Sequence, residues 1–167
     1  YQAYDQPTTD WPVAISAPEG QLTAITRDPY GKPVAIARES TVRMYGYDSQ
    51  QQLCRSEEPE TGTTLYAYDA AGNLTGSAAG LPAGTACGTP NTRTVSRGYD
   101  ARNRLVVLQF PDGNGDQSWT YTPDGLPAVV TTANGGASVT NTYSYNRRRL
   151  LDLPPIAVPL ITGRVRG

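Results

Sequence analysis

The sequence predicts an all-β protein built as an array of β-hairpins. Three observations predict it. A short motif recurs at a period of about 21 residues, which fits one hairpin of two strands and two turns. The 167 residues include 17 Gly and 14 Pro, a composition rich in turn formers. No stretch shows the apolar spacing of an amphipathic helix.

The motif reads aromatic, any residue, Tyr, Asp, two further residues, Gly or a polar residue, any residue, Leu. Its clearest copy spans 66–74, two others span 45–53 and 97–105, and two diverged copies span 119–127 and 143–151. The residues that define the repeat are Tyr47, Asp48, Tyr68, Asp69, Gly72, Leu74, Tyr99, Asp100, Leu105, Trp119, Tyr121, Gly125, Tyr143 and Tyr145. An earlier, degenerate copy has Arg27 in the Tyr position.

The first strand of each hairpin is predicted to end at the Tyr-Asp pair. Aromatic residues two positions apart point to one face of a strand, as in Tyr45/Tyr47 and Trp119/Tyr121. The Asp carboxylate can accept hydrogen bonds from N–H groups of the following turn. A positive φ is expected where the turn has its glycine, at Gly31, Gly72 and Gly125.

The return strand is predicted to begin at the Leu or Pro after this turn. A second turn class is expected at Pro18-Glu19-Gly20 and Pro111-Asp112-Gly113, where Pro comes first and Gly closes the turn. We interpret Arg55–Glu60 as a loop, because it is charged and lacks apolar spacing. The long interval between two copies contains an insert, Gly80–Asn91, rich in Gly, Pro, Thr and Ala.

Composition excludes several functions. With no His, the chain cannot build a Ser-His-Asp or Cys-His nucleophile system or a His-containing zinc site, and two Cys cannot form a four-thiolate site. The net charge of −1 argues against general nucleic-acid binding. No apolar run of about 18 residues is present, so no membrane-spanning helix is predicted. We therefore expect no enzyme, no cofactor, no nucleic-acid partner and no membrane span.

These residues resemble the Rhs family, also called YD-repeat proteins. The segments 68–74 and 99–105 match its repeat closely, and the resemblance extends from about residue 16 to residue 151. The resemblance implies that the hairpins form one large, twisted antiparallel sheet that spirals into a hollow shell, which in bacterial toxins encloses a variable C-terminal toxic domain until delivery. It implies a non-catalytic structural segment. Its partners would be the remaining shell repeats, on the same or a neighbouring polypeptide, and an enclosed toxin domain.

Three regions are predicted: a degenerate N-terminal segment (1–15), an array of about six hairpins (16–151) and a Pro-rich divergent tail (152–167). Six repeats are too few for a closed shell. The tail is interpreted as the end of a truncated or frameshifted gene, with a linker to a lost toxin as the alternative. The chain starts without Met or a signal-peptide pattern. We expect a secreted or cell-surface bacterial protein whose signal is not in this chain.

Two further features have open alternatives. Cys54 and Cys87 are predicted to form a disulfide that clips the insert to a neighbouring strand, which would stabilise an exported chain by about 3–4 kcal/mol; the alternative is two reduced thiols. Asp112, Asn114 and Asp116 have the spacing of the first ligands of a calcium loop, but Gln117 and Pro123 replace its expected Gly and Glu. We prefer a polar hairpin turn there.

The Tyr and Trp side chains allow a second function. We expect them to pack the sheet and pair across strands. Flat aromatic rings also suit sugar faces, so a carbohydrate- or surface-binding β-repeat module is the alternative to a shell segment. That module would show saturable glycan binding, weakened by substitution of Trp119 or Tyr121.

Overall fold

A computed structural model describes residues 2–4, 11–88 and 93–152 of the chain. These residues contain no helix, and their strands are β1 (Gln2–Tyr4), β2 (Pro12–Ser16), β3 (Leu22–Arg27), β4 (Pro33–Arg38), β5 (Thr41–Tyr47), β6 (Leu53–Glu58), β7 (Gly62–Tyr68), β8 (Leu74–Leu81), β9 (Val95–Tyr99), β10 (Leu105–Gln109), β11 (Asp116–Tyr121), β12 (Pro127–Asn134) and β13 (Ala137–Thr142). The tail from residue 153 onward lies outside the described residues.

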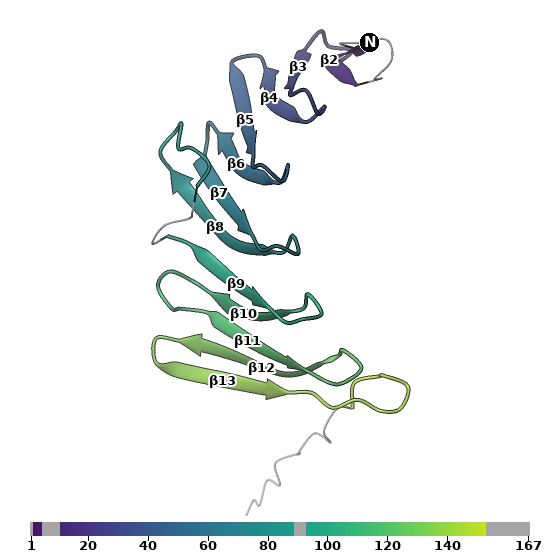
Figure 1. The fold of residues 1–167 in the computed structure, drawn as a ribbon, viewed down its shortest axis with the longest axis vertical. Helices are drawn as coiled ribbons and strands as arrows, with labels where there is room; N and C mark the ends of the chain where they lie inside the picture. Colours follow the sequence, from purple (N-terminus) through teal and green to yellow (C-terminus); the bar gives the residue numbers. More distant parts are fainter. Residues whose placement is uncertain (1, 5–10, 89–92, 153–167) are drawn as a thin grey trace, which may run out of the picture.

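All thirteen strands belong to one sheet, and their order in the sheet is their order in the sequence. Each strand pairs antiparallel with its sequence neighbours, so the sheet is a single meander of hairpins (Figure 1). The predicted all-β hairpin array is therefore confirmed. β1 and β2 continue the same sheet into the segment that sequence analysis set apart as residues 1–15.

The sheet has little buried core. Among the described residues, six side chains are buried, and all lie on the three central strands β6, β7 and β8: Cys54, Ser56, Thr63, Leu65, Ala78 and Leu81. Most other strand residues are half-buried, because a single layer leaves both of its faces near water. The strands are held mainly by their ladders and by contacts along the sheet, as in other repeat proteins.

A break in strand register marks the end of each YD strand. The pairing shifts between Thr26 and Arg27, Gly46 and Tyr47, Ala67 and Tyr68, and Thr120 and Tyr121. An extra residue at such a point bends the strand and increases its twist. The bulge thus recurs with the motif, and the β9–β10 hairpin has it as a shift between Leu105 and Val107 on the return strand.

The prediction of a loop at Arg55–Glu60 is wrong. Residues 53–58 form β6, and the turn comes afterwards. The buried positions of β6 are Cys54 and Ser56, and the charged residues between and after them are half-buried, so exposure alternates along the strand without an alternation of large apolar side chains. The charges are instead paired locally, with the Arg55 guanidinium 3.5 Å from the Glu57 carboxylate.

The two expected Pro-first turns do not form one class. The segment 17–21 has the same two backbone hydrogen bonds as the YD turns, from Ala17 N–H to the Gln21 carbonyl and from Gly20 N–H to the Ala17 carbonyl. It is a YD-type turn in which Ala replaces Asp. The turn at 110–115 differs, because the second glycine N–H bonds to Ala133 on the neighbouring hairpin.

Candidate functional site

The YD turns line one long edge of the sheet, where they join β3 to β4, β5 to β6, β7 to β8, β9 to β10 and β11 to β12 (Figure 1). In the first four of these turns one Asp oxygen accepts two backbone N–H groups, two and four residues ahead. Asp69 Oδ1 accepts from Ala71 and Asn73, both at 2.9 Å. The equivalent pairs start at Asp28, Asp48 and Asp100.

In the diverged turns the oxygen of another side chain takes the place of the Asp carboxylate and caps the backbone N–H groups of the turn. Asn146 Oδ1 accepts from the N–H groups of Arg148 and Leu150, at 2.9 and 3.1 Å. The Thr122 hydroxyl oxygen accepts from the N–H of Leu126 at 3.0 Å. The capped turns therefore share a short side-chain acceptor, because such a group can reach donors two to four residues away, whereas the turn at 17–21 forms the same backbone bonds without one.

The fourth residue of each turn, counting the Asp as the first, adopts a left-handed backbone conformation. Gly31, Gly72 and Gly125 have φ values of +83°, +83° and +91°, as predicted. Gln51 and Asn103 occupy the same position with φ values of +63° and +57°. Residues with a Cβ atom are strained there, and Asn tolerates the region better than Gln.

In four of the five copies that have it, all but the copy with Tyr68, the Tyr of the motif links its hairpin to the one before it. Its hydroxyl donates a hydrogen bond to the backbone carbonyl of the first residue of the preceding return strand. The pairs are Tyr47 to Pro33 (3.0 Å), Tyr99 to Leu74 (3.0 Å), Tyr121 to Leu105 (2.6 Å) and Tyr145 to Pro127 (2.9 Å). We call these contacts the Tyr ladder. The sequence predicts only that these rings pack the sheet, and the bonds of their hydroxyl groups are seen only in the structure.

The degenerate first copy keeps the same link by different chemistry. The Arg27 guanidinium donates to the carbonyl of Pro12, the first residue of β2, through Nε and Nη2, each at 3.3 Å. A third bond runs from Nη1 to the Gly31 carbonyl at 2.7 Å. A guanidinium is a planar, multivalent donor and can replace a phenol that donates one bond. The position therefore requires a donor of sufficient length rather than an aromatic ring.

Neighbouring turns also contact one another directly. Arg104 lies over the Tyr121 ring at 4.2 Å, and Lys32 lies over the Tyr47 ring at 4.8 Å. Turn-to-turn hydrogen bonds join Lys32 to the Gln51 carbonyl, Asn73 to Asn103 (2.9 Å), Arg102 to the Pro123 carbonyl (3.1 Å) and Arg149 to the Asp124 carbonyl (2.9 Å). Three of the residues that make these contacts, Lys32, Asn73 and Arg104, lie four positions after the Asp of their turn, and a polar residue at that place is the signal that the sequence offers for this edge.

Two of the turn carboxylates, those of Asp69 and Asp100, have a lowered pKa. The pKa of Asp100 is lowered to about 2, first by the hydrogen bond from the Arg104 side chain and then by backbone N–H groups of Arg104 and Arg102. The pKa of Asp69 is also lowered, with the Asn73 side-chain amide as the largest cause. A general acid at neutral pH needs a raised pKa. These carboxylates therefore serve as acceptors in turns.

The calcium-loop residues lie in the turn between β10 and β11. The Asp112 carboxylate accepts from the backbone N–H of Asn114 at 3.1 Å and from its side-chain amide at 3.3 Å. Asp116 Oδ1 accepts from the N–H of Phe110 at 2.8 Å. The two carboxylates are each engaged within the hairpin, in the way expected of a polar turn, and calcium binding stays a prediction to be tested.

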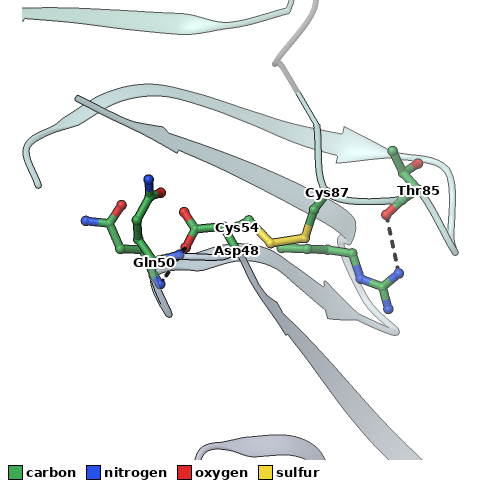
Figure 2. The surroundings of a disulfide bond; sticks show 7 residues. Asp48, Gln50, Cys54, Thr85 and Cys87 are labelled. Carbon is green, nitrogen blue, oxygen red and sulfur yellow. Dashed lines mark hydrogen bonds between the residues drawn. A yellow bond between two sulfur atoms is a disulfide. The ribbon is translucent and has the colours of Figure 1, made fainter. Parts of the chain in front are cut away.

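The insert is joined to the sheet by Cys54 and Cys87. The structure has a disulfide between them, with the Cα atoms 5.4 Å apart and 33 positions apart in the sequence (Figure 2). Cys54 is on β6, while Cys87 belongs to the segment after β8. The insert begins later than predicted, because β8 continues through Gly80 to Leu81.

Comparison with solved structures identifies the fold. The chain aligns with the crystal structure of TcdB2-TccC3-Cdc42 at a TM-score of 0.61 and 18% identity, and with that of TcdB2-TccC3 at 0.57 and 18%. The chain has an Rhs-like repeat fold. The alignments cover 81% and 77% of this chain but only 7% of each Tc-toxin chain. Neither a protein-family model nor a curated protein matches the sequence.

Proposed function

We propose that the chain is a non-catalytic structural segment of an Rhs-type shell that encapsulates or delivers a toxin polypeptide. The single observation that carries this proposal is the Rhs-like sheet itself, in which every hairpin is bonded to the next. The chain spans about 7% of the length of the toxin chains it matches, in keeping with one segment of a larger wall. Its partners would be further shell repeats, on the same or a neighbouring polypeptide, and an enclosed toxin domain.

The chemistry of the described residues supports a role without catalysis. The Asp of each YD turn accepts backbone hydrogen bonds, and the Tyr hydroxyls of the Tyr ladder donate to carbonyl groups. Among the described residues no group of three or more Cys, Asp or Glu side chains is arranged to hold a metal ion. None of the described segments is a helix able to cross a membrane. A secreted or cell-surface location goes with the proposed toxin role.

The strand β13 offers a surface on which a shell wall can continue. All six of its residues are exposed, and β12 is its strand neighbour among the described residues. Gly135 and Gly136 both have positive φ, which makes the β12–β13 connection a two-residue type I′ turn. In such a turn Asn134 and Ala137 form a hydrogen-bonded pair. Hydrogen-bonded and non-hydrogen-bonded pairs alternate along an antiparallel ladder, so Thr140, three residues further on, is in a non-hydrogen-bonded pair and its N–H points away from β12.

A test follows from this edge. Size-exclusion chromatography with light scattering and far-UV circular dichroism should show β-rich, polydisperse assemblies of the purified chain, because open strand edges promote pairing between copies. Thr140→Pro removes an N–H on the open side and should lower the mean mass. Thr140→Ala is the control, since it loses the same 3.1 Å hydroxyl contact with Thr131 but keeps the N–H.

Two results would contradict the proposal. The first is a single sharp peak of monomer mass at all concentrations, with a β-rich circular dichroism spectrum and a cooperative melt. A chain that behaves in this way is a self-sufficient domain. The second is an equal effect of the Pro and Ala substitutions, which would place association elsewhere.

A further inference from the structure

The segment after β8 folds back across the sheet. Residues 82–88, here called the hook, leave the end of β8 and contact β6, two strands away. The N–H of Gly84 donates to the Glu57 carboxylate at 3.0 Å. The Arg55 guanidinium donates to the Thr85 carbonyl at 3.4 Å, the dashed line at Thr85 in Figure 2. Since β7 lies between β6 and β8, the hook must cross β7.

The hook covers a defined face. Antiparallel partners point to the same side of a sheet, and the register places Arg55, Leu65 and Ala78 in one row across β6, β7 and β8. Glu57, Thr63 and Leu81 form the next row. In each row the β6 residue bonds to the hook and the β7 and β8 residues are buried, with exposures of 7% or less.

The hook thus explains why the buried apolar side chains of the described part are found on these strands. Leu65, Ala78 and Leu81 form one hydrophobic cluster. Elsewhere the sheet has no covering layer and no comparable cluster among the described residues.

Gly46 is the site where the disulfide lies against the sheet. A Cβ atom added there would lie 3.2 Å from Cys87 Sγ and 3.9 Å from Cys54 Sγ. The matching position in other copies of the motif holds Ala67, Gly98, Thr120 and Ser144, so a glycine there is not confined to this hairpin. At Gly46 the missing side chain leaves room for the two sulfur atoms.

We propose that the hook is a redox-controlled latch: a dithiol reductant opens the Cys54–Cys87 bond, releases the hook and uncovers the Leu65–Ala78–Leu81 cluster. The non-covalent bonds of the hook to β6 are few, and the segment consists of small residues around Pro82 and Gly84. The disulfide is therefore the main restraint on it. The latch is a property of this chain and does not depend on the shell role.

The exchange is directional because the two sulfurs differ in access. Cys87 is exposed, whereas Cys54 is 5% exposed. A thiolate of the reductant attacks Cys87 Sγ, the S–S bond breaks, and Cys54 leaves as a thiolate that takes up a proton. The second thiolate of the reductant then attacks its own mixed-disulfide sulfur and releases Cys87, which is protonated in turn. The protein gains two electrons and two protons, and the dithiol is oxidised to a disulfide.

The first test locates the attacked sulfur. The full-length oxidised chain is treated briefly with glutathione, a monothiol that stops at the mixed disulfide; free thiols are then alkylated and peptides are mapped by mass spectrometry. We expect glutathione on Cys87 and the alkyl group on Cys54. Glutathione mainly on Cys54, or equally on both, would overturn the proposed access.

The second test follows the cluster. Hydrogen–deuterium exchange is compared with and without dithiothreitol for peptides from β6–β8 and, as an internal control, from β11–β12. Reduction should speed exchange in β6–β8 by about tenfold or more and leave β11–β12 unchanged. Unchanged exchange in β6–β8, or an equal rise across all strands, would refute a local latch. A chain with Cys54→Ser and Cys87→Ser should match the reduced protein and not respond to dithiothreitol.

Discussion

Replacement of Tyr99 by Phe should lower the free energy of unfolding by about 1 kcal/mol. The substitution keeps the half-buried ring and removes only the hydroxyl that donates to the Leu74 carbonyl at 3.0 Å. A typical intramolecular hydrogen bond contributes about 0.5–1.5 kcal/mol net. For a chain of this size, 1 kcal/mol corresponds to a fall in Tm of about 2–4 °C.

The assay is urea unfolding followed by far-UV circular dichroism, with the slope m checked between variants. Tyr30→Phe is the matched control, because Tyr30 is 69% exposed and lies in a turn outside the Tyr ladder. It should change stability by less than about 0.5 kcal/mol. Tyr121→Phe should behave like Tyr99→Phe, since its hydroxyl donates to Leu105 at 2.6 Å.

The reasoning is refuted if Tyr99→Phe is no less stable than Tyr30→Phe at equal m. That result would mean that the hydroxyl-to-carbonyl bonds only replace equivalent bonds to water. The bonds of the Tyr ladder would then be a consequence of how the hairpins are spaced and would add nothing to the free energy of unfolding.

Three further predictions concern the turns. Gly72→Ala should lower the free energy of unfolding by about 1 kcal/mol, because Gly72 has a positive φ, whereas Gln51→Gly should raise the melting temperature by relieving the same strain. A stabilising Gly72→Ala or a destabilising Gln51→Gly would contradict the need for a left-handed residue at this position. Because Arg104 holds the pKa of Asp100 at about 2, below its ordinary 3.8, the stabilisation from that charge is present above pH 3.8 and disappears as the pH falls toward 2. The melting temperature of the unsubstituted chain should exceed that of Asp100→Asn at pH 6, and the difference should vanish near pH 2. The Asn side chain can still cap the turn, as Asn146 does in its own turn. A difference that stays the same at both pH values would show that the charge of Asp100 is not its cause. Calcium titration should give neither heat nor spectral change at the 112–116 loop, and saturable binding would restore the metal hypothesis.

Sequence reasoning succeeded where the contacts are local. The Asp cap of a YD turn joins groups two and four residues apart, and the glycine that follows has the φ that the turn requires. Both follow from the chemistry of a short stretch of chain. The same reasoning failed at β6, because its charged residues lack the apolar alternation by which strands are recognised. It also separated the turn at 17–21 from its class, since Ala replaces the Asp that marks the others.

The sequence by itself determined the strand-turn period, the capped turns and the all-β class, since each depends on residues within one hairpin. The tertiary structure alone decided which groups meet across hairpins. Tyr hydroxyls bond to carbonyls 14 to 25 positions away, and the hook bonds to β6 residues 27 to 30 positions away. Such contacts depend on strand order and register. These are properties of the whole sheet, and no local pattern encodes them.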